Sequence, residues 1–448
     1  MRAPFMWYNR AYRSCGGDLT LDYRTCTEFL RGRRVLCAVS GGADSTALLH
    51  ILCRARDAGL LTLCAAHFEH GIRGDESARD MEFVRRLCAE LNVPLQIGRA
   101  DVPSEAAANG EGLESCARRL RHAFLEDARV KAGADVIALA HHLRDRAETV
   151  LMHILRGGGI SGAAAMPRAS GHIVRPFIDV APQDIRAFLT QNGLAWREDA
   201  TNFVPDSPRN ALRLNVFPAL GQIYPGFERA LSRFSEIAAE DDAYLEACTD
   251  AYCARFMQQE WGIYILPKQD EAALVRRALR RVIPEADHQK IMSALRARGF
   301  CDLGGGCRAY GEGEKVYVLP PERALGSVGL NVRGCTRFYD ICEISAEECA
   351  AEPIKINAYI QTLNADALSG ACVRLKQDGD FIAPFGMNGK RKSLGDYLTD
   401  RKYPRPLRER LPLVAKGSEI LWVPGIGISE RARVVPDAPA LRLTLKPY

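Results

Sequence analysis

The sequence has no long run of hydrophobic residues. No stretch of about 18 consecutive apolar residues, the minimum for a membrane-spanning helix, occurs in the 448 residues. The first 17 residues contain arginines and lack the apolar segment of a secretory signal. The sequence therefore predicts a cytoplasmic protein without a membrane partner.

Cysteine pairs with the spacing of metal or redox motifs are also absent. The chain has 15 cysteines, but no C-x-x-C motif occurs, and the tightest pairs, Cys248/Cys253 and Cys301/Cys307, match no zinc spacing. Many of the others lie in apolar runs, as small buried thiols do. The pattern indicates a reducing compartment and no structural metal bound by cysteine.

Charge of one sign is in small excess over the whole chain, with a net charge of +5. The basic residues gather near the C-terminus: from Arg374 to the end there are 15 Lys and Arg against 8 Asp and Glu. A local basic surface predicts a polyanion partner. A solvated charged face would have the same composition, so charge alone leaves both interpretations open.

The order of the expected elements indicates an α/β fold. Strand patterns alternate with helical patterns, at Val35–Val39, Leu61–His67, Leu95–Ala100, Val136–Ala140 and Ile173–Phe177. This alternation predicts a doubly wound parallel sheet of five strands. The length favours two or three domains. We expect an N-terminal extension (1–24), a catalytic domain (25–215), a mostly helical middle domain (216–320) and a small, basic α+β C-terminal domain (321–448).

A loop of glycine and hydroxyl residues, S-G-G-A-D-S, follows the first strand. Gly41 and Gly42 let the backbone approach a phosphate closely, Ser40 and Ser45 add hydroxyl groups, and the following helix N-terminus favours anions. The lysine of a Walker A loop is missing. Asp44 is therefore expected to reach phosphates through Mg²⁺. The alternative is an ordinary turn in which Asp44 and Ser45 cap the helix.

Further polar side chains are expected at the same edge of the sheet. His67 and Arg73 lie at the end of the second strand and could contact a nucleotide, or could form a polar turn. Arg118 and Arg121, three positions apart, share a helical face. They would suit a polyphosphate or the charge that develops in an adenylyl transfer. An exposed basic face is the alternative.

One helical stripe carries a histidine and two carboxylates. His141, Asp145 and Glu148 fall at i, i+4 and i+7, and the stripe begins at the end of the fourth strand. The two carboxylates would suit an amine-bearing substrate, and one of them could accept a proton from it. Glu148 as a solvated surface residue is the alternative.

Two of these stretches carry a family resemblance. The S-G-G-x-D-S loop resembles the PP-loop of the N-type ATP pyrophosphatases, which have a Rossmann-like fold and cleave ATP between the α- and β-phosphates. The stretch H-H-L-R-D-R-A-E-T-V-L-M from His141 is similar to H-H-x-D-D-Q-x-E-T-V-L-M of the tRNA(Ile)-lysidine synthase family. Two positions of this stretch depart from the family pattern: Arg144 replaces Asp, and Arg146 replaces Gln. A third departure follows the second predicted strand, where Glu69 stands in place of the usual Asn or Asp.

The resemblance extends over 196–213 and over the basic C-terminal stretch, and it covers roughly residues 33–430. It implies tRNA contacts in both segments. The residues concerned are Arg209, Asn210, Arg213, Lys390, Arg391, Lys392, Arg405 and Arg408.

The resemblance also implies a reaction. A ligase of this family uses ATP to adenylate the carbon 2 carbonyl oxygen of the wobble cytidine in tRNA(Ile) with a CAU anticodon. The side-chain amine of free L-lysine then displaces AMP and gives lysidine. In this chain the loop residues, His67 and Arg73 would bind ATP with Mg²⁺. Arg118, Arg121 and His141 would act at the adenylate, and Asp145 and Glu148 would bind lysine.

Two other functions remain open from the sequence. Another PP-loop enzyme that modifies tRNA, such as a thiolase, shares the loop, although many thiolases use the C-x-x-C cysteines that are absent here. A catalytically inactive tRNA-binding homologue would explain Arg144 and Arg146. The sequence also leaves open whether the protein is a homodimer.

Overall fold

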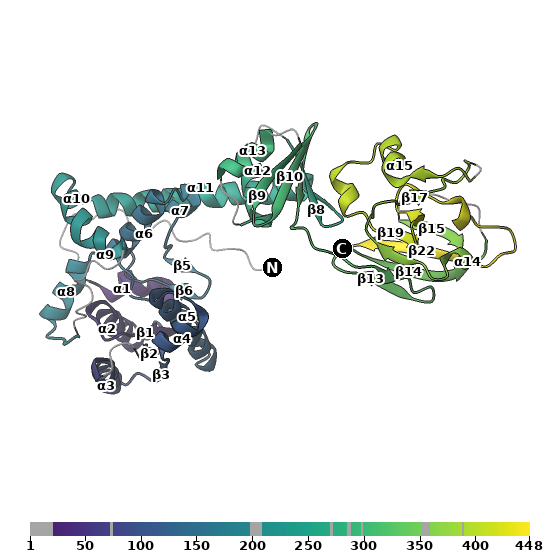
Figure 1. The fold of residues 1–448 in the computed structure, drawn as a ribbon. Helices are drawn as coiled ribbons and strands as arrows, with labels where there is room; N and C mark the ends of the chain where they lie inside the picture. Colours follow the sequence, from purple (N-terminus) through teal and green to yellow (C-terminus); the bar gives the residue numbers. More distant parts are fainter. Residues whose placement is uncertain are drawn as a thin grey trace. The chain divides into compact units, whose positions relative to one another are not determined.

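The computed structural model describes residues 21–71, 75–197, 208–268, 272–284, 288–296, 299–351, 359–387 and 389–448 (Figure 1). The chain forms two compact units, Met1–Ala243 and Tyr244–Tyr448. The long helix α11 (Phe227–Phe256) contains the division between them. In the described ranges, no helix is both long enough and apolar enough to cross a membrane.

The first unit contains the predicted parallel sheet. Its five parallel strands have the order β3-β2-β1-β4-β6, and a short antiparallel strand, β5, extends the edge beside β6. The strands are β1 (Arg34–Ala38), β2 (Thr62–Glu69), β3 (Leu95–Arg99), β4 (Val136–Ala138), β5 (Ala169–Ser170) and β6 (Ile173–Val174). β1 pairs with both β2 and β4, so the order reverses at β1, where doubly wound sheets bind ligands.

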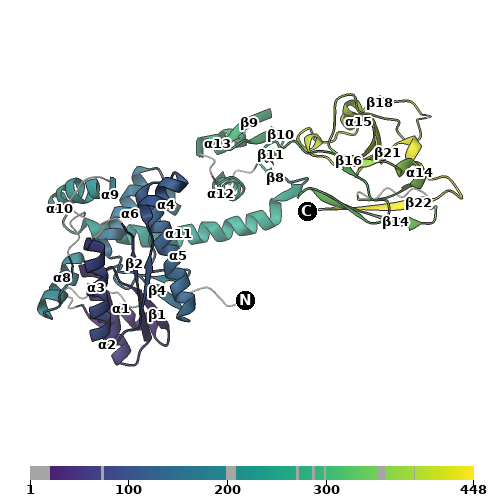
Figure 2. The ribbon, with the colours of Figure 1, turned by 60° about the horizontal axis from the view of Figure 1, so that its bottom comes forward.

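Helices cover both faces of this sheet because its strands are apolar on both sides (Figure 2). Val35 and Cys37 of β1 pack with α2, whereas Leu36 and Ala38 pack with α5. The helices of this unit are α1 (Tyr23–Thr27), α2 (Ala43–Asp57), α3 (Asp75–Glu90), α4 (Val102–Asn109), α5 (Leu113–Lys131), α6 (Leu143–Leu155), α7 (Gly159–Ala163), α8 (Pro182–Gln191), α9 (Pro208–Ala211), the π-helical turn η3 (Leu212–Val216), α10 (Phe217–Ile223) and the first part of α11.

The region expected to be mostly helical combines helices with an antiparallel sheet. The sheet has the order β7-β8-β11-β10-β9 and lies beside α12 (Ala272–Val282) and α13 (His288–Arg296). Its strands are β7 (Gln258–Glu260), β8 (Ile263–Pro267), β9 (Gly299–Gly304), β10 (Cys307–Glu312) and β11 (Lys315–Leu319). Successive side chains of β8 point to opposite faces of the sheet. Leu266 packs with the helices, whereas Ile263 and Ile265 belong to the hydrophobic core that the C-terminal strands form.

The rest of the second unit is rich in β-structure. One sheet has the order β12-β16-β19-β20-β17-β18 with β21 beside β20, and a second has the order β13-β14-β22-β15. The strands are β12 (Val328–Gly329), β13 (Cys335–Phe338), β14 (Cys342–Cys349), β15 (Ile360–Asn364), β16 (Cys372–Arg374), β17 (Phe381–Ile382), β18 (Lys392–Ser393), β19 (Leu413–Lys416), β20 (Glu419–Val423), β21 (Gly427–Ile428) and β22 (Ala440–Pro447). The α-helices are α14 (Ala365–Leu368) and α15 (Leu394–Asp400).

Candidate active site

The S-G-G-A-D-S loop connects β1 to α2 and is held by its own hydrogen bonds. The Ser45 hydroxyl accepts from the backbone N–H groups of Ser40 (3.1 Å) and Gly41 (3.2 Å) and donates to the Gly42 carbonyl (3.1 Å). Gly41 has a φ of +96°, which favours glycine. Ser45 is buried and Ser40 is exposed. Ser45 therefore shapes the loop, and the Ser40 hydroxyl remains accessible to a ligand.

The loop leaves the start of α2 open to an anion. Gly42 is the N-cap residue, and no side chain of the described residues caps the helix through it. Its orphan N–H groups and the helix dipole favour a negatively charged ligand. A residue that the sequence patterns did not single out, Arg197, fixes the loop from the other side, since its N–H donates to the Gly41 carbonyl (2.9 Å).

Asp44 lies in the first turn of α2, with its side chain 43% exposed. Burial raises the pKa of its carboxyl group, although the nearby His142 acts in the opposite direction. Among the described residues, no group of three or more His, Cys, Asp or Glu could hold a metal ion. Mg²⁺ shared with a nucleotide needs only one or two carboxylates besides the phosphates, so Asp44 fits this requirement.

His142 and Asp145 form a reciprocal cap at the start of α6. The Asp145 N–H donates to His142 Nδ1 (3.3 Å), and the His142 N–H donates to Asp145 Oδ2 (3.0 Å). His142 Nε2 lies 3.7 Å from Asp44 Oδ2. His142 was not among the predicted site residues, although an N-cap with an acidic residue three positions later is a recognisable capping pattern. The cap places Asp145 close to the loop.

Asp145 and Glu148 lie on α6, and each pairs with arginines from a later segment of the chain. Glu148 is fully buried and accepts from Arg209 Nε (2.7 Å), Arg213 Nε (2.7 Å) and Arg213 Nη2 (3.0 Å). Arg209 Nη2 also donates to Asp145 Oδ1 (3.1 Å). We call these four residues the arginine–carboxylate cluster. The residues predicted to bind lysine and two of those predicted to bind tRNA therefore lie together. Asn210, also predicted to bind tRNA, follows Arg209 on helix α9.

His142 and the cluster residue Arg209 keep Asp145 ionised. Burial alone would raise the pKa of Asp145, but His142 and Arg209 outweigh it, and the pKa lies below the usual value. At neutral pH, Asp145 is a carboxylate that can accept hydrogen bonds from cationic groups.

Arg118, Arg121, His141 and Arg175 form a basic group beside the cluster. Burial lowers the pKa of His141 to about 4, so its ring is neutral at pH 7. Arg175 Nε donates to His141 Nδ1 (3.3 Å), which leaves Nε2 as the N–H donor. Arg121 is half-buried and has no ion pair with any residue that the structure describes. Burial and the neighbouring Arg118 lower the pKa of Arg121, which favours an anionic ligand here.

The two arginines that depart from the family pattern have structural partners. Arg146 is 3% exposed and donates from Nη1 to the Ser232 hydroxyl (2.7 Å), Glu236 (2.8 Å) and Asp179 (3.0 Å). Arg144 pairs with Glu228 (2.7 Å). Both connect α6 to the first part of α11, and neither enters the cluster around Asp145. At the third departure, Glu69 pairs with Arg99.

The remaining predicted residues lie in different surroundings. His67 is buried, and its Nδ1 is 2.8 Å from the Val39 carbonyl, so it binds the backbone that leads into the loop. Burial lowers the pKa of His67. Arg73 lies outside the described residues.

The basic residues of the second unit divide into two groups. Lys390, Arg391 and Arg405 are exposed, and the Arg391 guanidinium stacks on the Phe381 ring at 4.6 Å from its centroid. Lys392 pairs with Asp400, and Arg408 donates to the Tyr403 carbonyl (2.7 Å). Arg391 and Lys392 also line a cavity of about 460 Å³.

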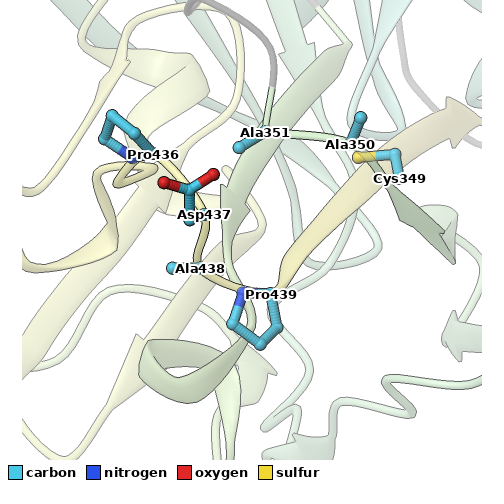
Figure 3. Close-up of a pocket in the computed structure, with 7 residues that line it drawn as sticks. All are labelled: Cys349, Ala350, Ala351, Pro436, Asp437, Ala438 and Pro439. Atoms are coloured by element: carbon cyan, nitrogen blue, oxygen red, sulfur yellow. The ribbon is translucent and has the colours of Figure 1, made fainter.

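A second cavity of this unit, of about 600 Å³, lies between 349–351 and 436–439 (Figure 3). The described residues that line it provide a carboxylate (Asp437), a thiol (Cys349), and alanine and proline side chains.

Comparison with known proteins gives the family. PP-loop domains match residues 20–220, and the TilS substrate C-terminal domain matches residues 372–445. The tRNA(Ile)-lysidine synthase of Symbiobacterium thermophilum is 34% identical over 463 residues, which cover 93% of this chain and 94% of that protein. Its counterpart in Parabacteroides distasonis is 32% identical over 448 residues, with coverage of 92% and 94%. The chain belongs to the tRNA(Ile)-lysidine synthase family.

Proposed function

We propose that the protein converts the wobble cytidine of tRNA(Ile) with a CAU anticodon to lysidine. ATP adenylates the carbon 2 carbonyl oxygen and releases pyrophosphate, and the side-chain amine of free lysine then attacks carbon 2 and displaces AMP. The observation that carries this proposal is the continuity of the site. Asp44 of the phosphate loop is linked through His142 to Asp145 and the arginine–carboxylate cluster.

The loop side of this site suits the first half of the reaction. The Ser40 hydroxyl, the backbone around Gly41 and Gly42, and the open N-terminus of α2 would bind the phosphates that leave as pyrophosphate. His67 would hold the backbone at Val39, just before the loop, in place. Arg73 is proposed as a further ATP contact from the sequence alone. Mg²⁺ held by Asp44 would neutralise phosphate charge when it is bound.

The basic group suits the adenylate. Arg118 and Arg121 carry positive charge without a carboxylate to neutralise it among the described residues, and the burial of Arg121 makes a charged partner favourable beside it. Neutral His141, held by Arg175, would donate its Nε2 hydrogen to an oxygen of the adenylate. Asp145 and Glu148 would supply the negative charge that attracts lysine, and Asp145 could accept the proton that the attacking amine loses.

A direct test is mass analysis of the nucleosides of isoleucine tRNA after incubation with the protein, ATP and labelled lysine. We expect labelled lysidine and one AMP for each lysidine formed. A cytidine that remains unmodified, or one that gains sulfur in place of lysine, would refute this function.

We also propose that the basic C-terminal region binds the same tRNA and that the reaction takes place in the cytoplasm. The candidate residues there are Lys390, Arg391, Lys392, Arg405 and Arg408, and Arg209, Asn210 and Arg213 are the candidates in the catalytic unit. Because Lys392 and Arg408 have partners within the chain, Lys390, Arg391 and Arg405 are the better candidates for phosphate contacts.

Replacing Lys390, Arg391 and Arg405 together by alanine should weaken tRNA binding and its dependence on salt. Each lost phosphate contact is expected to reduce the slope of log affinity against log salt concentration by about one unit. Filter binding across a salt series measures this slope. Arg333→Ala, an exposed arginine of the same unit, is the control. An unchanged slope in the triple variant would place the tRNA elsewhere.

A further inference from the structure

The turn between β7 and β8 places a buried tryptophan in an unusual backbone conformation. Trp261 and Gly262 form this two-residue turn, with φ values of +54° and +74°. Turns with positive φ at both positions favour Asn, Asp or Gly at the first of them, and a bulky residue there is an outlier. Trp261 is nevertheless only 1% exposed. A strained residue persists only where its surroundings hold it in place, and such residues gather at functional sites.

The residues that hold Trp261 come from a segment that follows 142 positions later. The indole Nε1 donates to the Tyr403 hydroxyl (2.8 Å), which donates in turn to Glu260 (2.9 Å). Arg410 Nε donates to the Trp261 carbonyl (2.9 Å). The indole ring lies in the hydrophobic core that the C-terminal strands form. The turn therefore contacts both ends of one loop, residues 401–411, which we call the basic loop.

The basic loop has a held side and a free side. On the held side, Arg408 donates from Nε and Nη2 to the Tyr403 carbonyl (3.0 and 2.7 Å), and from Nη1 to the Thr399 hydroxyl (2.8 Å). On the free side, Lys402 and Arg405 are exposed and pair with no carboxylate among the residues that the structure describes. Two such cations on a fixed backbone can meet two phosphates at a set spacing.

The Tyr403 hydroxyl is the central contact between the turn and the basic loop. It accepts from Trp261 and donates to Glu260, so both of its hydrogen-bonding roles serve the turn. Loops that become ordered only on binding reduce the affinity of a complex, and a loop that is ordered beforehand avoids this loss. The contacts of Tyr403 and Arg410 order the basic loop within the protein itself.

We propose that Trp261 and Tyr403 are positioning residues for tRNA binding. They preorganise the basic loop, so that Lys402 and Arg405 present their charges to phosphates of the tRNA without a cost of ordering the backbone. The strained turn at Trp261 is retained because it brings the indole N–H to the Tyr403 hydroxyl. This inference rests on the proposed function for the identity of the RNA.

The first test follows backbone hydrogen exchange in the wild-type, full-length protein without tRNA. The N–H groups of Tyr403, Arg408 and Arg410 each donate to a backbone carbonyl. We expect residues 401–411 to exchange at least about 10-fold more slowly than an unstructured peptide of the same sequence, as ordered backbone does. Mass spectrometry of peptic fragments measures this rate. A smaller ratio would show that the loop is not ordered before binding, and the proposal would be wrong.

The second test uses Tyr403→Phe, which removes one oxygen atom. Kd and KM for tRNA should rise about 3- to 10-fold, while kcat and the KM values for ATP and lysine stay within twofold. Tyr252→Phe is the matched control, because Tyr252 is 3% exposed and donates to the Pro267 carbonyl (3.3 Å). It should leave Kd for tRNA unchanged. If Tyr403→Phe unfolds earlier but binds tRNA with the wild-type Kd, the hydroxyl is only structural and the proposal fails.

A double-mutant cycle tests whether Tyr403 acts through the basic loop. Arg405→Ala should weaken tRNA binding by the wild type more than it weakens binding by Tyr403→Phe, because a loop that is no longer held presents Arg405 less often. Trp261→Phe keeps an aromatic ring, loses the N–H donor and should give the same loss as Tyr403→Phe. Full additivity of the Arg405 and Tyr403 effects on log Kd would show that the hydroxyl acts elsewhere and would refute the proposal.

These measurements separate the inference from the proposed function. If tRNA binding depends on Tyr403 but the wild-type protein forms no lysidine, the proposed function fails and the inference stands. If the wild-type protein forms lysidine and Tyr403→Phe leaves Kd for tRNA unchanged, the inference alone fails. Because the exchange measurement uses the wild-type protein, it decides even if a variant does not fold.

Discussion

Replacing Asp44 by asparagine should reduce the rate of lysine- and tRNA-dependent AMP formation by about 100- to 1000-fold. Removing one preorganised electrostatic contact to reacting phosphates has effects of this size. Asparagine keeps the shape of the side chain but cannot neutralise a metal ion. Release of AMP from labelled ATP measures the rate. AMP formation at the wild-type rate would remove Asp44 from the adenylation site.

The same variant should not lose stability, which separates a functional effect from a folding effect. Burial raises the pKa of Asp44 in the folded state, so ionising this carboxyl group at neutral pH opposes folding. The stability that this group contributes is present at low pH and is lost as the pH rises through its folded pKa. At pH 7, Asp44→Asn should therefore unfold at the same urea concentration as the wild type or a higher one.

A matched control lies at the other end of the same helix. Asp57 is the last residue of α2, is 65% exposed and pairs with Arg56. Asp57→Asn removes one carboxylate from α2 without touching the loop. It should leave AMP formation unchanged, and a similar loss in both variants would point to a general effect of charge on the helix.

The sheet and the loop were predictable because their signals are local. The apolar strands and the intervening helical patterns lie in consecutive residues, and they gave the five parallel strands that the structure contains. The S-G-G-A-D-S pattern placed the loop at the end of β1 for the same reason. The sequence did not distinguish the two serines of the loop. In the structure the Ser45 hydroxyl holds the loop together, whereas Ser40 is exposed.

The arginine–carboxylate cluster could not be predicted in the same way. Arg209 and Arg213 lie more than sixty positions from their carboxylate partners, and no periodic pattern connects such residues. The family resemblance of the segment 196–213 suggested an RNA contact for both arginines. The long-range contacts of Arg144 and Arg146 with α11 were hidden for the same reason, because their acidic partners follow 84 and 90 positions later.

The middle of the chain shows the limit for short strands. β7, β8 and β9 have three to six residues each, and a strand of this length resembles a buried helix segment by periodicity. The alternation in β8 and β11 becomes clear only when both covering layers are known. Val316 and Val318 face α12, and Tyr317 and Leu319 join the core with Phe338.

Replacing Arg146 by alanine should destabilise the catalytic unit by about 2–3 kcal/mol, the scale of losing charge-assisted hydrogen bonds from a buried guanidinium. Its buried guanidinium donates to Asp179, to the half-exposed Glu236 and to the buried Ser232 hydroxyl, so its loss removes three hydrogen bonds and leaves a space beside Ser232. Urea denaturation followed by circular dichroism should show an earlier transition for this unit. Activity should fall only with the folded fraction, because Arg146 does not touch the cluster around Asp145.

Arg144→Ala provides the comparison for this effect on the same helix. Arg144 is 37% exposed and has a single carboxylate partner, Glu228, so its removal should cost less than about 1 kcal/mol. If the two variants unfold together, exposure does not decide the cost of these ion pairs. If Arg146→Ala is instead as stable as the wild type but inactive, the arginine has a catalytic role that its contacts do not explain. The expected order, a large loss for Arg146 and a small one for Arg144, would show that the two departures from the family pattern fasten α6 to α11.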